Sequence, residues 1–140
     1  MIIGLGSDVI SIDRVATLLN KSGDKFKEKT FTKYEIEASA RYGENNSQAI
    51  AAHFAKRFAA KEAFAKAVGT GFGKHLSFTD VGIKNDAAGK PIITLNKKAQ
   101  NLVQSIAGEG KQIACHISIS DDYPYALAVV IIEVVGNHVG

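Results

Sequence analysis

The sequence predicts an α+β fold in which helices pack on one mainly antiparallel sheet. Three observations lead to this expectation. Residues 1–9 alternate around two glycines as a strand does, residues 12–68 carry apolar residues at helical spacing, and two strand pairs with short turns follow. The resulting order is one strand, three helices, two strands, one helix and two strands, which is typical of helices covering an antiparallel sheet.

The composition indicates one globular domain over residues 1–140. Hydrophobic residues make up 46% of the chain and charged residues 22%, which does not indicate disorder. Cys115 is the only cysteine, so no intrachain disulfide can form, and the paired-cysteine spacings of zinc sites are absent. This cysteine usage fits a reducing cytoplasm, where we expect the protein to reside.

Neither a signal peptide nor a membrane span is expected. The N-terminal stretch MIIGLGSD has no basic region and reaches an acid at Asp8. The longest apolar run, Tyr125–Ile132, has eight residues, far fewer than the ~20 that cross a bilayer. This run is therefore predicted to be a buried strand.

The first predicted strand, 1–9, brings a carboxylate to its end. Gly4, Gly6 and Asp8 share one face of this strand. The opposite face carries the apolar residues Ile3, Leu5 and Val9. Two glycines beneath a carboxylate let a bulky group or another backbone approach closely. An Asp that caps the following turn is the alternative interpretation, and it stays open at this point.

Capping residues predict two helices after this strand. Ser11 can cap a helix over 12–21, which the sequence Ser22-Gly23-Asp24 then ends. Residues 32–35 have the form of a capping box, which predicts a second helix to about Arg41.

A long helix from about Gln48 to Val68 carries the most informative acid. Glu62 falls in the middle of an apolar stripe of this helix, and Lys66 lies one turn further on. The stripe consists of Ala51, Phe54, Ala55, Phe58, Ala65 and Val68. An ionised carboxylate against apolar surface costs several kcal/mol unless a cation or donor meets it, so Glu62 is expected to have a fixed partner. The alternative is an exposed Glu62–Lys66 pair worth a few tenths of a kcal/mol.

Turn residues define the remaining elements. Gly69 can end the long helix, and the sequence GTGFG frees the backbone to lie against a ligand, although a flexible turn has the same composition. Strands are predicted over 78–84 and 91–95, a helix over 96–107, and strands over 112–120 and 125–135.

Positive charge is concentrated in residues 14–33. This segment has six bases against two acids, a net charge of +4, whereas the whole chain has +3. A basic segment on a nearly neutral body favours an anionic partner, and nucleic acid, an acidic protein and phosphorylated metabolites all qualify. A solvated helix face is the alternative.

Three separated stretches match the signatures of one family. GLGSDVISIDR (4–14), RFAAKEAFAKAVGTG (57–71) and HISISDDYPYA (116–126) closely resemble those of the holo-acyl-carrier-protein synthases, the small bacterial class of 4'-phosphopantetheinyl transferases. The sequence Gly89-Lys90-Pro91 matches a further feature. The resemblance implies the fold of that family and transfer of 4'-phosphopantetheine from coenzyme A to a serine of apo acyl carrier protein. Adenosine 3',5'-bisphosphate is released in this step of fatty acid biosynthesis.

The resemblance also implies roles for individual residues. Asp8 and Glu62 match the acids that bind Mg²⁺ at the pyrophosphate of coenzyme A, and Lys66 matches the lysine near the transferred phosphate; these three are the expected catalytic residues. The expected contacts to the nucleotide part of coenzyme A are Arg57, Gly69, Gly71, His116 and Ser118. Arg14 lies on the helix that meets the carrier protein in the family, and the charge of residues 14–33 adds Lys21 and Lys25 as expected outer contacts.

The chemistry of the residues agrees with these roles and leaves one of them open. Mg²⁺ prefers oxygen ligands, usually one or two carboxylates completed by waters and phosphates, which fits Asp8 and Glu62. The base that removes the serine proton is not identified, because Glu62 and a water held by the metal or by Asp8 both qualify. His116 alone would be interpreted as a core residue, and only the resemblance assigns it to the nucleotide. His53 and His75 match no functional position.

Partners follow from the same resemblance. The family typically forms homotrimers with active sites between neighbouring subunits. The competing class is a non-catalytic module that binds nucleic acid through residues 14–33, but this segment has two aromatics and no RNA-binding signature. It would also leave Asp8 and Glu62 unexplained, so no nucleic-acid partner is expected. A transferase that serves another carrier, such as a polyketide or peptide synthetase domain, stays open.

Overall fold

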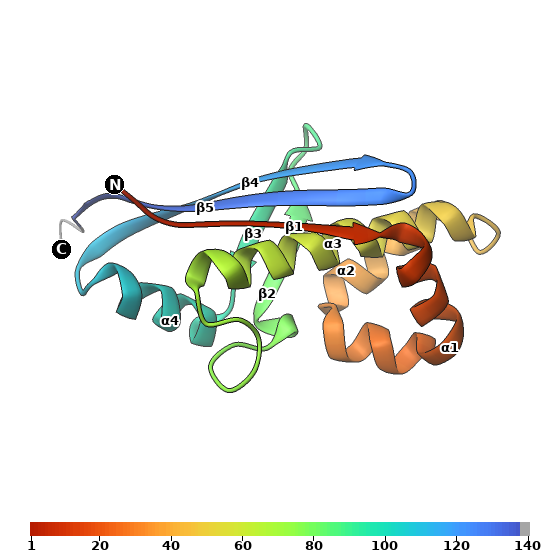
Figure 1. Cartoon of the computed structure of the whole chain (residues 1–140), viewed down its shortest axis with the longest axis horizontal. Coiled ribbons are helices and arrows are strands. Elements are labelled where there is room, and N and C mark those ends of the chain that lie inside the picture. The colour runs from red at the N-terminus through yellow and green to blue at the C-terminus, as the bar shows by residue number, and fades with distance from the viewer. Residues whose placement is uncertain (138–140) are drawn as a thin grey trace.

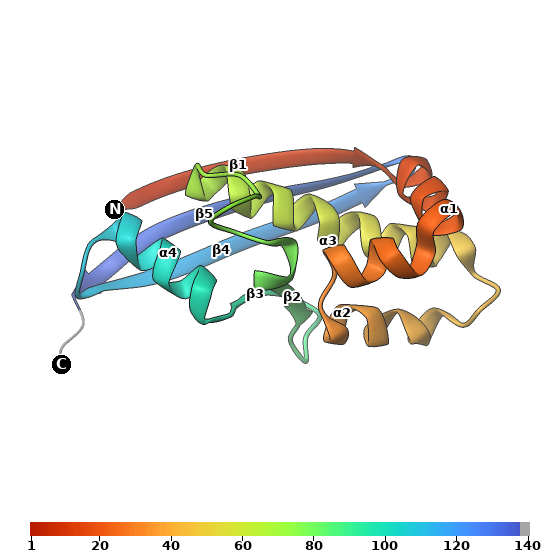
Figure 2. The same cartoon turned by 90° about the horizontal axis from the view of Figure 1, so that it is seen from below.

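A long helix lies across a three-stranded sheet in the computed structural model, which describes residues 1–137 (Figure 1). The helices α1, α3 and α4 lie on the same side of this sheet, α1 and α4 at its opposite ends (Figure 2). In chain order the elements are β1 (Ile2–Ser11), α1 (Ile12–Thr30), α2 (Lys33–Ala38), a 3₁₀ turn (Ser39–Tyr42), α3 (Ser47–Val68), a second 3₁₀ turn (Phe78–Asp80), β2 (Val81–Asn85), β3 (Pro91–Leu95), α4 (Lys97–Ala107), β4 (Lys111–Asp122) and β5 (Tyr125–Asn137).

The α+β class is confirmed, but the strands form two antiparallel sheets instead of one. One sheet has the strand order β1-β5-β4, and β2 pairs only with β3. The β2–β3 hairpin runs across the long strands in Figure 1, a direction that prevents it from continuing their hydrogen-bond ladder.

Two glycines of β1 allow α3 to pack directly on the strand. A Cβ atom added at Gly4 or Gly6 would overlap the carbonyl oxygens of Ala67 or Ala63, respectively. The expected close approach of another backbone is therefore confirmed, and that backbone belongs to α3. Because Asp8 shares this face of β1, its side chain also points toward the helix side of the sheet.

The burial pattern of α3 corrects the predicted single apolar stripe. Thirteen of its 22 residues are buried, and they are distributed around the helix instead of along one stripe. Contacts with the sheet, α1 and the β2–β3 hairpin explain this pattern. Glu62 is only half-buried and lies between half-buried Phe58 and exposed Lys66, on the most open row of the helix. It therefore sits at the border of the core and not in the middle of an apolar face.

The helix ends agree with the capping residues, with one correction. Thr32 and Glu35 form the predicted capping box of α2, and Gly69 ends α3 in the left-handed conformation at φ 92°. The helix predicted over 12–21 does not end at Ser22: this residue has non-helical angles that kink α1, and the helix then continues to Thr30.

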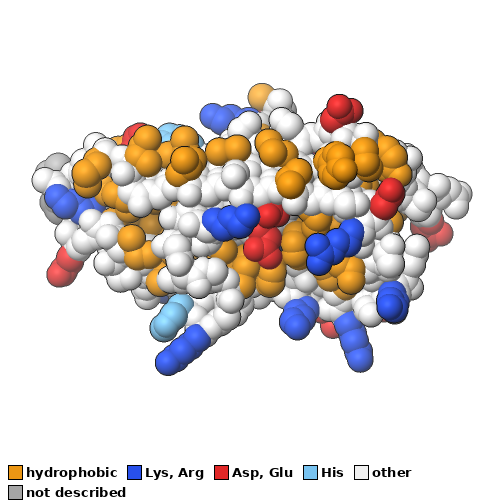
Figure 3. All heavy atoms as spheres, in the orientation of Figure 1, with side chains coloured by type: hydrophobic (Ala, Val, Ile, Leu, Met, Phe, Trp, Pro, Cys, Tyr) orange, Lys and Arg blue, Asp and Glu red, His pale blue; other side chains and the backbone are white. Residues whose placement is uncertain are grey.

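The strand β5 is buried on one face only, which corrects the prediction for its apolar run. Its inner residues Ala126, Ala128, Val130 and Ile132 are at most 2% exposed. On the outer face, Tyr125 and Leu127 are exposed, as are Leu5 and Val9 on the neighbouring β1. We call these four residues the outer apolar face, and Figure 3 shows hydrophobic atoms running along the sheet. No helix within residues 1–137 is long and apolar enough to cross a membrane.

Candidate functional site

Asp8 of β1 and Glu62 and Lys66 of α3 come together where the strand crosses the helix. The Lys66 ammonium donates to the Ser7 carbonyl at 2.9 Å and to Oδ1 of Asp8 at 3.2 Å. The Asp8 side chain is 18% exposed and that of Lys66 is 54% exposed, so the cluster is open to solvent on the lysine side. We call these three residues the carboxylate site. The close packing that Gly4 and Gly6 permit is what brings the strand and helix residues within reach.

The carboxylate site contains two acids and one base, so its net charge is negative when both acids are ionised. Burial and the neighbouring Asp8 raise the pKa of Glu62, and Lys66 opposes this shift. Within residues 1–137, Lys66 forms its ion pair with Asp8, and Glu62 has no hydrogen bond or ion pair from its side chain. No group within residues 1–137 is therefore the expected fixed partner of Glu62, and the alternative of a simple Glu62–Lys66 pair is wrong.

Two neighbouring carboxylates with one lysine between them suit a hard divalent cation. The part of the chain that the structure describes contains no cluster of three or more His, Cys, Asp or Glu side chains that could hold a metal alone. Mg²⁺ commonly takes one or two carboxylates and completes its shell with waters and substrate phosphates. The residues therefore fit Mg²⁺ bound together with a phosphate-bearing ligand.

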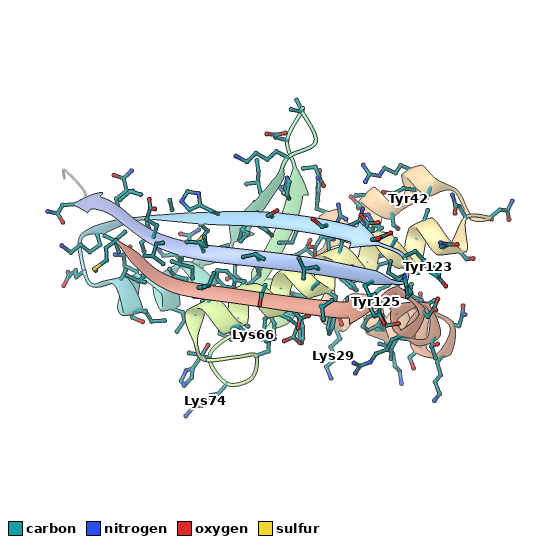
Figure 4. All side chains as sticks on the ribbon, turned by 45° about the horizontal axis from the view of Figure 1, so that its top comes forward. Lys29, Tyr42, Lys66, Lys74, Tyr123 and Tyr125 are labelled. Carbon is teal, nitrogen blue, oxygen red and sulfur yellow. The ribbon has the colours of Figure 1, made fainter. Side chains whose placement is uncertain are left out.

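The glycine loop after α3 leads into an aromatic hollow on the same side as Lys66. Gly69 and Gly71 have φ of 92° and 65°, and a side chain added at either would meet no neighbour. Glycine is thus required there by backbone angle and not by close approach. The rings of Phe72 and Phe78 are stacked with their centres 3.9 Å apart. Together with Lys29 they line a hollow of about 500 Å³. Figure 4 shows Lys29 and Lys66 on one side of the molecule.

Arg57 belongs to a second cluster. Its side chain is 5% exposed, and its guanidinium donates to the His53 carbonyl at 3.1 Å and to Oδ1 of Asn85 at 2.9 Å. Its Nε has no partner among the described residues. Arg57 lines a pocket of about 160 Å³. In the lining of this pocket, Nζ of Lys56 lies 3.7 Å from Oδ1 of Asp121. The polar lining of this basic pocket consists of Arg41, Lys56, Arg57, Asn85 and Asp121.

The carboxylate site and the basic pocket point in different directions from one helix. Arg57 and Glu62 are five positions apart, which separates their side chains by about 140° around α3. His116 and Ser118 lie on a third surface, because they are exposed on the outer face of β4 whereas Asp8 faces inward. Nε2 of His116 is 3.9 Å from a carboxylate oxygen of Glu133. One chain therefore does not bring His116, Ser118 or Arg57 to the carboxylate site.

The residues predicted to bind a carrier protein are all accessible. Arg14, Lys21 and Lys25 are exposed along α1, on either side of the kink at Ser22. Lys27 of the same basic segment differs, because it is half-buried with its ammonium 5.6 Å from the centre of the Phe54 ring. Fewer positive charges are therefore exposed on this surface than the number of bases in the sequence indicates.

Sequence reasoning missed a buried ion pair next to Glu62. Lys61 and Glu35 are fully buried, with Nζ and Oε1 2.7 Å apart. The ammonium also donates to the carbonyls of Phe78 and Val81 at 2.9 and 2.7 Å. The sequence offers no local signal for this pair, because α3 carries several other charged residues and the capping box already accounts for Glu35.

Comparisons with known proteins agree with the motifs. Residues 4–128 match the 4'-phosphopantetheinyl transferase superfamily. The chain is 46% identical over 134 residues to the holo-[acyl-carrier-protein] synthase of Zymomonas mobilis, covering 95% of this chain and 97% of that protein. Its fold is similar to that of the Bacillus anthracis holo-(acyl-carrier-protein) synthase in complex with CoA (3',5'-ADP), with TM-score 0.75, 35% identity and coverage of 96% and 98%. The Helicobacter pylori holo-[acyl-carrier-protein] synthase in complex with coenzyme A has TM-score 0.75, 31% identity and coverage of 92% and 99%.

Proposed function

The chain belongs to the 4'-phosphopantetheinyl transferase superfamily, and from this premise we propose how its residues perform the reaction of a holo-[acyl-carrier-protein] synthase. The reaction moves 4'-phosphopantetheine from coenzyme A to a serine of apo acyl carrier protein. The observation that carries our assignment is the meeting of Asp8, Glu62 and Lys66 where β1 crosses α3. We take the whole chain, 1–140, to act as one transferase domain.

The reaction exchanges one phosphorus–oxygen bond for another. The serine oxygen of the carrier attacks the phosphorus that bears pantetheine, the bond to the second phosphate breaks, and adenosine 3',5'-bisphosphate leaves. Asp8 and Glu62 would hold Mg²⁺, which withdraws charge from the pyrophosphate when bound. Positioning and charge stabilisation are the main contributions that a protein makes to such a transfer.

Lys66 is placed to offset the charge that develops on the departing bisphosphate. Its ammonium is held beside Asp8 by that carboxylate and by the Ser7 carbonyl, so it is positioned to pair with a phosphate that binds next to Asp8. The serine proton goes to Glu62 or to a water held at the carboxylate site, and the two routes stay open. The raised pKa of Glu62 makes its carboxylate a stronger proton acceptor than an ordinary glutamate.

The basic pocket suits the nucleotide part of coenzyme A. Arg57 lines this pocket although it is almost fully buried, and its two terminal nitrogens donate only to neutral acceptors, so its charge is available to an anion bound there. Arg41 and Lys56 also line the pocket, and because Asp121 offsets only one of the three bases, the lining stays positive. Gly69, Gly71, His116 and Ser118 remain proposed contacts to the same part of the ligand.

We propose that a second copy of the chain completes each site. Arg57 and Glu62 point apart, and His116 and Ser118 lie on the opposite face of the sheet from Asp8. The four side chains of the outer apolar face are each 42–66% exposed on neighbouring strands, as expected of a surface that another protein covers. A homotrimer satisfies both features, with Asp8, Glu62 and Lys66 from one subunit and the basic pocket from its neighbour.

The proposed partner is an acidic carrier protein, and the proposed location is the cytoplasm. The exposed bases Arg14, Lys21 and Lys25 are the proposed docking contacts for an acidic carrier protein. We propose a cytoplasmic enzyme without a nucleic-acid partner, since the basic residues are accounted for by the carrier and by coenzyme A. Fatty acid biosynthesis is the proposed pathway.

Mixing two inactive variants tests the shared site. Arg57→Ala and Glu62→Gln should each be nearly inactive alone, with Mg²⁺, coenzyme A and apo carrier present. After co-refolding, mixed oligomers contain sites with an intact Arg57 and an intact Glu62 from different subunits, so activity should return. The amount of holo carrier measured by mass spectrometry gives the result. If the mixture stays as inactive as its components, the site residues act within one chain.

A further inference from the structure

Glu35 uses more acceptors than its role in the capping box requires. Its Oε1 accepts the Thr32 backbone N–H at 2.8 Å, which is the capping contact, and also the Lys61 ammonium. Its Oε2 accepts the Ile83 backbone N–H of β2 at 2.9 Å. Its own carbonyl accepts Nε2 of His53 at 2.8 Å. A helix cap alone would leave the last two contacts unexplained.

Both of these additional contacts lead to Arg57. The two groups that accept the Arg57 guanidinium are the carbonyl of His53 and the side chain of Asn85. Glu35 holds the His53 ring directly. It also holds β2 at Ile83, two residues before Asn85, whose amide is fixed by a further bond to the Gly89 carbonyl. Both acceptors of Arg57 are therefore anchored to Glu35: the strand that carries Asn85 through the carboxylate, and the His53 ring through the main-chain carbonyl.

Charge supports the same connection. Burial lowers the pKa of Arg57, and the Glu35 carboxylate is the main influence that opposes this shift. Glu35 is fully buried and forms no hydrogen bond or ion pair with Arg57 within residues 1–137, so its charge favours the guanidinium without occupying any of the arginine N–H groups. An anion that enters the basic pocket therefore finds an arginine that is charged and already oriented.

We propose that Glu35 is a positioning residue that orients Arg57 for the phosphate groups of the nucleotide in coenzyme A. This inference rests on the proposed assignment of the basic pocket to the nucleotide. The competing explanation is that Glu35 only joins α2, α3 and β2. It would then matter for stability and not for nucleotide affinity.

Glu35→Gln separates the two explanations. The amide cannot accept all the bonds that the carboxylate accepts, so one anchor of Arg57 is lost while size is kept. Titration calorimetry with adenosine 3',5'-bisphosphate should show Kd raised about tenfold or more, the effect expected of one lost charge-assisted hydrogen bond. In turnover assays the KM for coenzyme A should rise by a similar factor, with kcat at saturation changed less than about twofold.

Asp80→Asn is the matched control. Asp80 is also a buried capping-box carboxylate, and it bonds Ser77 and Asn96 beside the start of β2 without touching the partners of Arg57. It should lower the melting temperature and leave the Kd for adenosine 3',5'-bisphosphate unchanged. The inference is overturned if Glu35→Gln behaves like this control. Should Glu35→Gln not fold because Lys61 loses its partner, Glu35→Gln with Lys61→Met removes both charges and gives the same comparison.

Arg57→Ala distinguishes failure of this inference from failure of the proposed function. If Arg57→Ala binds adenosine 3',5'-bisphosphate as tightly as the natural protein does, the basic pocket is not the nucleotide site and the proposed assignment fails. If Arg57→Ala loses binding and Glu35→Gln keeps it, only the positioning role of Glu35 fails.

Discussion

The Lys66 ammonium lies 3.2 Å from Oδ1 of Asp8, whereas Glu62, one helical turn before Lys66, has no partner for its carboxylate within residues 1–137. The lysine therefore neutralises the strand acid and leaves the helix acid with an unfavourable charge. A divalent cation that arrives with a phosphate-bearing ligand would offset this charge, as the proposed function requires.

Glu62→Gln should remove activity and increase stability of the metal-free protein at neutral pH. The folded state raises the pKa of Glu62, so ionised Glu62 opposes folding. The gain should be present near pH 7 and should vanish as the pH falls through the ordinary glutamate pKa of about 4.3. Thermal unfolding against pH measures it, and turnover should fall about 100-fold or more.

Chelation of divalent ions in assays of the natural enzyme provides the control for Glu62→Gln. Chelation of divalent ions should abolish turnover, and added Mg²⁺ should restore it. Turnover that survives complete chelation would show that the two carboxylates do not act through a metal.

Lys66→Ala should lower kcat more than it raises the KM for coenzyme A, because its charge matters most as the bisphosphate leaves. We expect kcat to fall about tenfold to 100-fold. Lys66 also opposes the rise in the Glu62 pKa, so its removal should move the acid limb of the pH–rate profile to higher pH. An effect confined to KM would make Lys66 a binding residue only.

The sequence predicted the elements well where local chemistry decides them. The capping box at Thr32 and the left-handed Gly69 are local features, and both are present as expected. The alternation of Gly4, Gly6 and Asp8 correctly indicated a close approach of another backbone.

Features that depend on tertiary contacts could not be read from the sequence. The helical periodicity predicted that Glu62 lies within an apolar stripe. Other elements cover α3 on several sides, however, so Lys61 is buried and Glu62 is only half-buried. Likewise Glu35 was explained by its own capping box, although its second oxygen bonds Ile83, 48 residues away. Such pairings have no local signal in a single sequence.

Gly6→Ala should destabilise the protein by about 3 kcal/mol or more, because the new methyl group would overlap the carbonyl of Ala63 and force β1 away from α3. Urea unfolding measures the loss. Gly23→Ala is the matched control, since its methyl group meets no neighbour within 4 Å, and it should be neutral or slightly stabilising. Equal effects of the two substitutions would contradict the close packing.

His53 should make the protein lose stability as the pH falls from 6.5 to 4. Burial lowers the pKa of His53 to about 4, so the unfolded state binds its proton more readily over this interval. The loss amounts to about 3 kcal/mol at pH 4. His53→Gln can still donate to the Glu35 carbonyl and does not titrate. Its urea unfolding should therefore depend less on pH, and an unchanged pH dependence would exclude His53 as the cause.

Arg14→Glu should raise the KM for the carrier protein steeply and leave the KM for coenzyme A nearly unchanged. Arg14 is exposed on α1 within the segment of net charge +4, next to the strand that carries Asp8. Contacts of this kind steer encounter and are screened beyond roughly 8 to 10 Å at physiological salt, so added salt should also raise the KM of the natural enzyme for the carrier protein.

Lys21→Glu and Lys25→Glu should have smaller effects on the KM for the carrier protein. Lys97→Glu makes the same reversal on α4, at the opposite end of the molecule from α1, and should not change the KM for the carrier. If Arg14 only covers its own helix, its reversal would alter stability by about 0.5 kcal/mol or less and leave the kinetics unchanged. An unaltered KM for the carrier in the folded variant would place the docking surface elsewhere.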